Sequence, residues 1–275
     1  MEEMDLSLSP AEIAARYAVL GEAKAKKPTA ILIVLGMMAG ALIALGSAST
    51  NTASYGITDT WTARMVCSLL FPFGLGCVMI IGAELFTGNC MITLPLMEKR
   101  CTALQMLRNW ILVYTSNFVG AFLVALGCAW FGQMNYSDGL LAVYTMKVAI
   151  AKCNISFANG VVSGILCNFL VSLGVLMSIS GKDATGRMLG AYLPVCFFVL
   201  CGFEHCVANM YYISAGLLAK AVPAYAELAI AKGLDLSALT VSNFLFGNLL
   251  PVTIGNIIGG GGLGLAMWFC YLRKH

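Results

Sequence analysis

The sequence predicts an all-α membrane protein with six transmembrane segments. Apolar residues make up 60% of the chain, while Asp, Glu, Lys and Arg make up only 11%, against about a quarter in soluble domains. Six apolar runs are each long enough for a membrane-spanning helix, which needs about 20 residues. Two of these runs are too long for one crossing and contain a short polar stretch. We therefore expect the second and fifth transmembrane helices to be broken.

A short helix is expected ahead of the first apolar run. Ser9 and Pro10 supply an N-cap and a proline at the first helical position, and Glu12 lies in the first turn. Apolar residues then recur at helical spacing. We expect residues 1–28 to form an N-terminal amphipathic helix on the cytoplasmic membrane surface. The polar start of the chain lacks the pattern of a secretory signal.

The channel domain is expected to cover residues 29–275. It divides into two repeats of three apolar runs, residues 29–131 and residues 157–271. The six runs cover residues 29–48, 65–97, 103–131, 157–179, 189–219 and 239–271.

An internal repeat relates the two halves. The polar islands at 82–89 and 202–209 both read G-x-E-x-x-x-x-N. Because each half has an odd number of crossings, the second is expected to be inverted relative to the first. The island matches are Glu84 with Glu204 and Asn89 with Asn209, both 120 positions apart (204 minus 84, 209 minus 89). The helix matches are Gly36 and Gly40 with Gly160 and Gly164, and Asn109, Asn117 and Gly120 with Asn248, Asn256 and Gly259.

Positive charge predicts the orientation in the membrane. With six crossings both termini lie on one side, and the segments on that side hold eleven of the sixteen Lys and Arg residues. The positive-inside rule makes this side cytoplasmic, in the cell membrane. The net charge of +3 is too small to indicate a nucleic-acid partner. The eleven residues are Arg16, Lys24, Lys26, Lys27, Lys99, Arg100, Arg108, Lys182, Arg187, Arg273 and Lys274.

The sequence indicates neither a metal site nor a cofactor. None of the eleven cysteines forms a C-x-x-C pair, and most lie in apolar runs, where cysteine acts as a small apolar side chain. Cys206, beside His205, is the candidate for a reactive thiol. No phosphate-binding loop and no nucleophile with its base is present, so we expect a protein that is not an enzyme.

The two polar islands are expected to meet near the middle of the bilayer. The N-termini of the second half-helices then offer N–H groups and partial positive charge, which favour a small anion. His205 is the one histidine at this depth, and an unperturbed histidine side chain titrates near neutral pH. We expect it to bind or protonate a weak-acid anion, or alternatively to brace the broken helix. Thr87 is expected to donate a hydrogen bond to the anion or to cap its half-helix.

The remaining polar residues of the islands are expected to shape the loops. Glu84 and Glu204 suit acceptors for the N–H groups exposed at the helix breaks, and a bare carboxylate in the path would repel an anion. Asn89 and Asn209 have the same expected role. None of the four is placed in the path itself.

Three motifs resemble those of the formate/nitrite transporter family. They are E-L-F-T-G-N at 84–89, G-F-E-H at 202–205 with A-N-M at 208–210, and N-L-L-P-V-T-I-G-N-I-I-G-G at 248–260. The resemblance covers nearly the whole chain. It implies an aquaporin-like protomer with broken second and fifth helices, assembled as a homopentamer with one pore in each subunit.

The resemblance also assigns residues to the path. It implies an outer constriction at Leu85 and Phe198 and an inner constriction at Phe71 and Leu75. Between them Thr87 and His205 would form the central pair.

The family's vestibule residues fall on Lys152 and Asn168. Lys152 is expected to attract anions to the outer mouth or to help protonate them. The implied mechanism is passage of a small monovalent anion, with protons, through a dry gap.

Formate is the first substrate that we expect, followed by nitrite or hydrosulfide, with lactate or acetate as further candidates. A pore for neutral solutes is a more remote alternative, and the paired Asn-Pro-Ala loops expected for it are absent.

Overall fold

The computed structural model describes residues 8–273, and the regular structure within this range consists of helices, with no strand. Expectations that concern residues 1–7, Lys274 and His275 lie outside the described residues. Short turns of other helix types cover Cys90–Ile92, Gln133–Asn135 and Asn243–Leu249. The α-helices are α1 (Pro10–Lys26), α2 (Thr29–Ser54), α3 (Thr60–Leu70), α4 (Phe73–Ile81), α5 (Phe86–Asn89), α6 (Thr93–Met97), α7 (Ala103–Trp130), α8 (Leu140–Cys153), α9 (Phe157–Ser180), α10 (Ala184–Cys201), α11 (Cys206–Lys220), α12 (Pro223–Ala231) and α13 (Leu250–Tyr271).

Six helical segments within the described chain are long and apolar enough to cross a membrane. They are α2, α3 with α4, α7, α9, α10, and α13 with the turn that precedes it. The helices α11 and α12, which meet at 95°, would together make a seventh. The all-helical class and the six apolar spans are thus confirmed, while the inversion of one half relative to the other stays a prediction.

The helical conformation is interrupted within each polar island, at residues 82–85 and 202–205. Helix α4 ends before Gly82 and α10 ends before Gly202, and both glycines adopt φ 72° and ψ 30°. This left-handed conformation is typical of a glycine at a helix C-terminus, since a Cβ strains it. After three further residues, helices α5 and α11 begin. The same local backbone therefore recurs in both halves.

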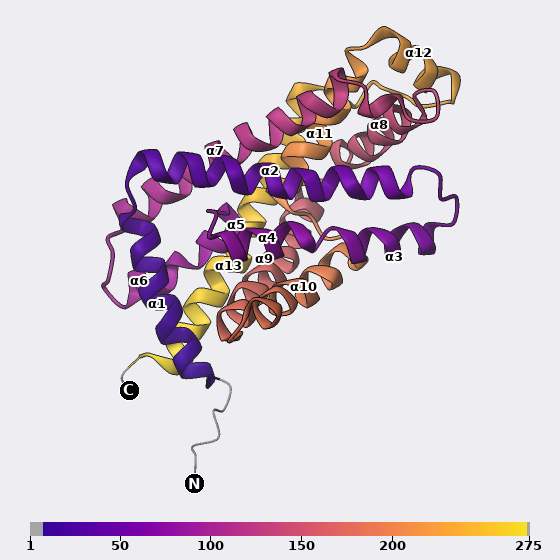
Figure 1. Cartoon of the computed structure of the whole chain (residues 1–275). Helices are drawn as coiled ribbons and strands as arrows, with labels where there is room; N and C mark the ends of the chain where they lie inside the picture. Colours follow the sequence, from indigo (N-terminus) through magenta and orange to yellow (C-terminus); the bar gives the residue numbers. More distant parts are fainter. Residues whose placement is uncertain (1–7, 274–275) are drawn as a thin grey trace.

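Each half contains two long helices that pack against each other, α2 with α7 in the first half and α9 with α13 in the second (Figure 1). Small residues allow each pair to approach closely. A Cβ added at Gly120 would collide with the carbonyl oxygen of Met37, and one at Gly259 would collide with that of Ile165. Both of these matching glycines thus lie where the two long helices of their half approach closely.

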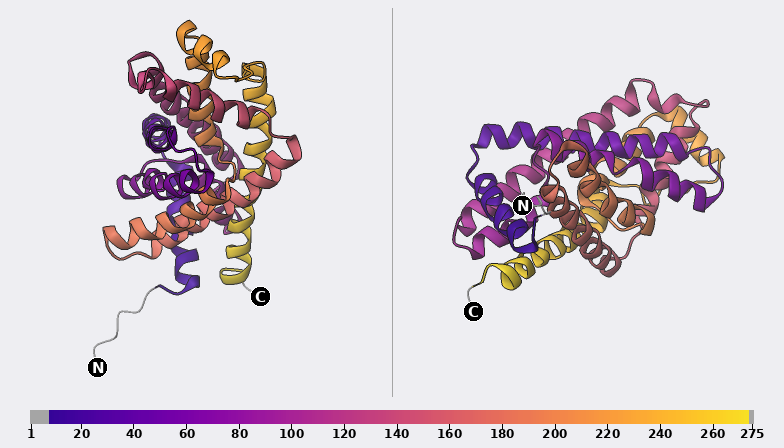
Figure 2. Two further views of the ribbon diagram at one scale, coloured as in Figure 1. Left: turned by 90° about the vertical axis from the view of Figure 1, so that its right-hand side faces the viewer. Right: turned by 60° about the horizontal axis from the view of Figure 1, so that its bottom comes forward.

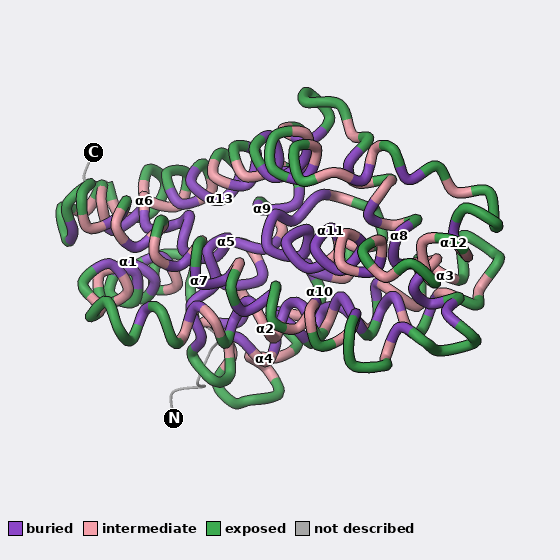
Figure 3. The backbone as a smooth tube through the Cα atoms, turned by 90° about the horizontal axis from the view of Figure 1, so that it is seen from above, coloured by how far each residue is buried: buried purple, intermediate pink, exposed green. Residues whose placement is uncertain are grey.

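Helix α5 and the first turns of α11 lie at the centre of the molecule. All four residues of α5 are buried, whereas the outward faces of the long helices are exposed (Figure 3). Leu104, Ile111 and Phe131, for example, expose between 64% and 81% of their surface. Such faces suit contact with lipid or with another subunit. Residues 83–89 and 204–209 of the two polar islands are therefore enclosed by protein.

Helix α1 packs against the bundle. Its N-terminus has the expected cap, in which the Ser9 and Glu12 side chains each bond the other's backbone N–H. Its small face, which includes Ala14, Ala18 and Gly21, is buried against α6, α7, α9 and α13. Helix α1 and the end of α13 lie at one end of the molecule and α12 at the other (Figure 2). The buried face of α1 therefore contacts protein rather than the membrane surface that we expected.

The close contact of α9 with α13 predicts a stability difference between two glycines of the same helix. At Gly255 a Cβ would collide with the Val161 carbonyl oxygen and lie 2.9 Å from the Gly164 Cα, while at Gly262 nothing lies within 4 Å. We expect Gly255→Ala to lower the melting temperature of the detergent-solubilised protein by about 3 to 10 °C, since overpacking costs about 1–3 kcal/mol. Gly262→Ala, the matched control, should leave it unchanged or slightly higher. Equal melting temperatures for the two variants would contradict this view of the contact.

Candidate functional site

The two polar islands meet at a hydrogen bond between Thr87 and His205. Thr87 lies in α5, and His205 immediately precedes α11. The Thr87 Oγ1 and the His205 Nε2 are 3.0 Å apart, and both side chains are buried. The sequence-based expectation placed these two residues at the centre, and the structure brings them into contact.

The backbone of α11 determines which nitrogen of His205 carries the proton. The Ala208 N–H donates to His205 Nδ1 at 3.0 Å, so that the imidazole caps the helix. Because Nδ1 accepts, a neutral His205 carries its hydrogen on Nε2 and donates it to Thr87 Oγ1. The hydroxyl hydrogen of Thr87 is then available for another acceptor.

Two cavities approach the central pair from opposite sides. The α1-side cavity, of about 220 Å³, is lined by parts of α1 and of the first island, including Glu84, Leu85 and Gly88. The Lys152-side cavity, of about 200 Å³, is lined by residues that include Lys152 and His205. The central hydrogen bond thus lies between two hollows.

The apolar residues assigned to the path group differently from our expectation. Phe71 and Phe198 both line the Lys152-side cavity, with ring centroids 5.7 Å apart in an edge-to-face arrangement. Leu75 and Leu85 both line the α1-side cavity. The expected pairs, Leu85 with Phe198 and Phe71 with Leu75, are therefore wrong as pairs. The ring of Phe198 also stacks on His205, with centroids 5.9 Å apart.

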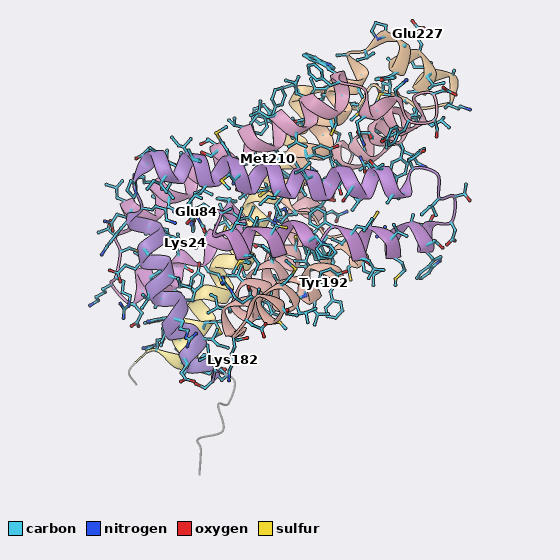
Figure 4. All side chains as sticks on the ribbon, viewed as in Figure 1. Lys24, Glu84, Lys182, Tyr192, Met210 and Glu227 are labelled. Atoms are coloured by element: carbon cyan, nitrogen blue, oxygen red, sulfur yellow. The ribbon has the colours of Figure 1, made fainter. Side chains whose placement is uncertain are left out.

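The carboxylate of Glu84 is neutralised by two lysines from the N-terminal segment. Lys24 Nζ lies 2.9 Å from Oε2 and Lys27 Nζ 2.8 Å from Oε1, and Figure 4 shows Lys24 beside Glu84. The Asn89 amide donates to Oε2 at 2.8 Å and to Asn109 Oδ1 at 3.0 Å. Glu84 is 1% exposed, so an unpaired charge here would be costly.

Glu204 has a matching set of partners. Lys152 Nζ lies 3.0 Å and 3.1 Å from its two carboxylate oxygens. The Asn209 amide donates to Glu204 Oε2 and, at 2.8 Å, to Asn248 Oδ1. The Lys152 ammonium also lies 5.2 Å from the ring centroid of Tyr212. Both glutamates therefore accept hydrogen bonds from lysine and asparagine side chains. We had expected them to accept from backbone N–H groups instead.

The first N–H group of each second half-helix is already bonded. Asn117 Oδ1 accepts from the Phe86 N–H at 2.9 Å, and Asn256 Oδ1 accepts from the Cys206 N–H at 2.9 Å. The same two amides donate to the carbonyl oxygens of the island glutamates. Our expectation of free N–H groups at these positions is therefore wrong.

Asn168 lies away from both cavities. It is fully buried, and its amide donates to the carbonyl oxygens of Thr87 at 3.1 Å and Asn256 at 2.6 Å. It therefore joins the two halves behind the central pair rather than lining a vestibule beside Lys152. Cys206 is also fully buried. No group of three His, Cys, Asp or Glu residues suited to a metal ion occurs in residues 8–273.

The sequence reasoning missed Lys24 and Lys27 as partners of Glu84. A signal for Lys24 was present in the repeat, since Asn109 matches Asn248. In the structure Asn109 donates to the Lys24 carbonyl oxygen and Asn248 to that of Lys152, both at 2.9 Å. Lys24 therefore occupies the position in the first half that Lys152 occupies in the second.

Comparisons with known proteins agree on one family. The family model described as "Formate/nitrite transporter" matches residues 11–270. The formate channel FocA of Escherichia coli K12 is 36% identical, and the match covers 98% of this chain and 96% of FocA. A probable formate transporter of Methanothermobacter thermautotrophicus is 33% identical over 97% of this chain and 98% of its own length.

Solved structures give the same result. A pentameric formate channel with formate bound superposes with a TM-score of 0.81 at 29% identity, covering 90% of this chain and 99% of that one. An ion channel of the same family superposes with a TM-score of 0.77 at 28% identity, covering 94% and 97%. From the motifs, the fold and these similarities, the chain belongs to the formate/nitrite transporter family.

Proposed function

We propose that this protein is a membrane channel for small monovalent weak-acid anions and that formate is its main substrate. The observation that carries the proposal is the buried hydrogen bond between Thr87 and His205, which lies between two cavities that each contain lysine. The names of the similar proteins support formate, since they include formate channels and a probable formate transporter. The family and its solved members are channels or transporters, so we propose transport without chemical conversion.

Apolar side chains on both sides of the central pair would strip water from the solute. Phe71 and Phe198 flank it on one side, and Leu75 and Leu85 on the other, all buried. A bare anion is costly in such surroundings unless it gains hydrogen bonds. The Thr87 hydroxyl and the His205 Nε2–H are two side-chain donors at this depth. We propose that they stabilise the solute in the gap.

The helix cap on His205 favours hydrogen bonding over direct proton donation by this residue. A neutral imidazole has one N–H, and donating that proton outright would leave an anion on the ring. Charging His205 beforehand would place a proton on Nδ1, where the Ala208 N–H already donates. We therefore propose that any proton that accompanies the anion comes from the solution in the cavities, and that His205 supplies a hydrogen bond.

The pairing of Glu204 with Lys152 keeps the Lys152-side cavity open to anions. Without the lysine, the carboxylate would repel them close to the constriction. With both charges present the pair is neutral, although the ammonium still provides local attraction. The proposed role of Lys152 is thus to offset Glu204 and to attract the arriving anion.

We propose a homopentamer in the cytoplasmic membrane, with both termini in the cytoplasm. The solved pentameric relative supports the assembly, and the excess of Lys and Arg on the α1 side supports the orientation. Light scattering of the detergent-solubilised protein should give five chains of 29.2 kDa. Reporter proteins fused to each terminus should both be active in the cytoplasm. A different mass would contradict the assembly, and an external reporter would contradict the orientation.

The function is tested by flux into proteoliposomes. We expect rapid, pH-dependent uptake of formate, followed in rate by nitrite or hydrosulfide, with no chemical change in the recovered solute. His205→Phe should strongly reduce the formate flux because it removes the central donor. Faster flux of nitrite or hydrosulfide than of formate would reassign the substrate. Equal formate flux in the native protein and the variant would contradict the role of His205.

Thr87→Val tests the second donor without changing the volume of the side chain. We expect formate flux to fall by about 10- to 100-fold, since a hydrogen bond to a charged group contributes about 1.5–3 kcal/mol. Thr115→Val is the matched control, because the Thr115 hydroxyl is exposed on α7 and bonds back to its own helix. A fall of the same size in both variants would show that the Thr87 hydroxyl has no specific role.

A further inference from the structure

A second hollow adjoins the α1-side cavity on the outside of the protein. We call it the basic groove. It lies between α1 and the end of α9 with the start of α10, and its volume is about 650 Å³. Three of the residues that line it, Arg16, Lys182 and Arg187, are cationic and none is acidic. The cations come from segments far apart in the sequence, so the fold brings them together.

The basic groove lies next to the α1-side cavity. Leu20, Ile179 and Arg187 line both hollows. Arg187 is fixed at this junction, because its Nη2 donates to the Met79 carbonyl oxygen at 2.9 Å, in the last turn of α4. A cation is thus held where the two hollows adjoin.

Helix α1 covers the direct way out of the α1-side cavity. The Tyr17 hydroxyl donates to the Gly88 carbonyl oxygen at 2.9 Å, a buried bond that ties α1 to α5. Further along the chain Lys24 and Lys27 bind Glu84. These contacts hold α1 over the α1-side cavity, which shares Leu20, Ile179 and Arg187 with the basic groove.

We propose that the basic groove is the lateral entrance by which the transported anion enters and leaves on the α1 side. This inference rests on the proposed transport of anions and adds the route and the residues that attract the solute. Arg16 lies on the exposed face of α1. Converging charges of one sign in a hollow raise the local concentration of the opposite ion and its rate of entry.

Glu12, the acid nearest to Arg16 along α1, interacts with Arg16 electrostatically but lies outside the basic groove. Glu12 lies one turn earlier, and its carboxylate accepts from the Ser9 hydroxyl and the Ser9 N–H, both at 2.7 Å. These bonds hold the pKa of Glu12 below its ordinary value. Glu12 does not line the basic groove.

The experiment is the formate conductance of the native protein and of Arg16→Glu in planar bilayers, with salt varied in one compartment at a time. At about 0.01 M salt, where the Debye length is about 30 Å, we expect Arg16→Glu to lower the conductance by about three- to tenfold, and at about 1 M salt the difference should vanish. The effect should appear when salt is lowered on the α1 side alone. Arg16→Gln should give an intermediate value, since it removes the charge without reversing it.

Lys232→Glu is the matched control. It makes the same charge change at an exposed lysine beside α12, at the opposite end of the molecule (Figure 1). It should not alter the dependence on salt on the α1 side. Equal conductance of Arg16→Glu and the native protein at low salt would overturn the proposal, and so would a loss that high salt does not reverse. If the native protein conducted no anion, the proposed function would fail instead, so the two failures are distinct.

Discussion

The structure depends on a single constraint, that a backbone interrupted at membrane depth must be hydrogen-bonded by the protein itself. Lipid offers no hydrogen-bond partner there, and each unpaired N–H or C=O costs several kcal/mol. Asn117 and Asn256 meet this need in the two halves, since each amide accepts from the first N–H of a half-helix and donates to the carbonyl oxygen of the island glutamate. The interruption in turn allows the Thr87 and His205 side chains to meet in the interior. The polar centre of the protein is therefore a consequence of how its broken helices are supported.

Much of this arrangement was predictable from the sequence. Polar residues inside overlong apolar runs indicated the interruptions, because a charged side chain in such a run requires a protein environment. The spacing shared by Glu84 and Glu204 indicated equivalent local structures, and both glycines that end the preceding helices adopt the same left-handed conformation. Thr87 and His205 were identified from their chemistry and depth, without knowledge of the distance between them.

The remaining details needed three-dimensional contacts. The four apolar side chains of the path were expected in the wrong pairs, because apolar residues carry no chemical mark of the neighbour that they face. Asn168 was expected in a vestibule but joins Thr87 to Asn256, a bond that depends on how α9 lies against both islands. The lysine partners of Glu84 come from the N-terminal segment, and the sequence had suggested that this segment lies on the membrane. The ion pairs of Lys24 and Lys27 with Glu84 therefore depend on the packing of α1 against the bundle.

The amide of Asn168 has a mechanical consequence. Through it the carbonyl group of Thr87 in the first half is tied to that of Asn256 in the second, and Asn256 in turn holds the start of α11. The two polar islands are thereby held together by one side chain that is hydrogen-bonded to both halves. A carrier cycle in which one half moves relative to the other would have to break these hydrogen bonds. Diffusion through a channel of fixed shape would leave them intact.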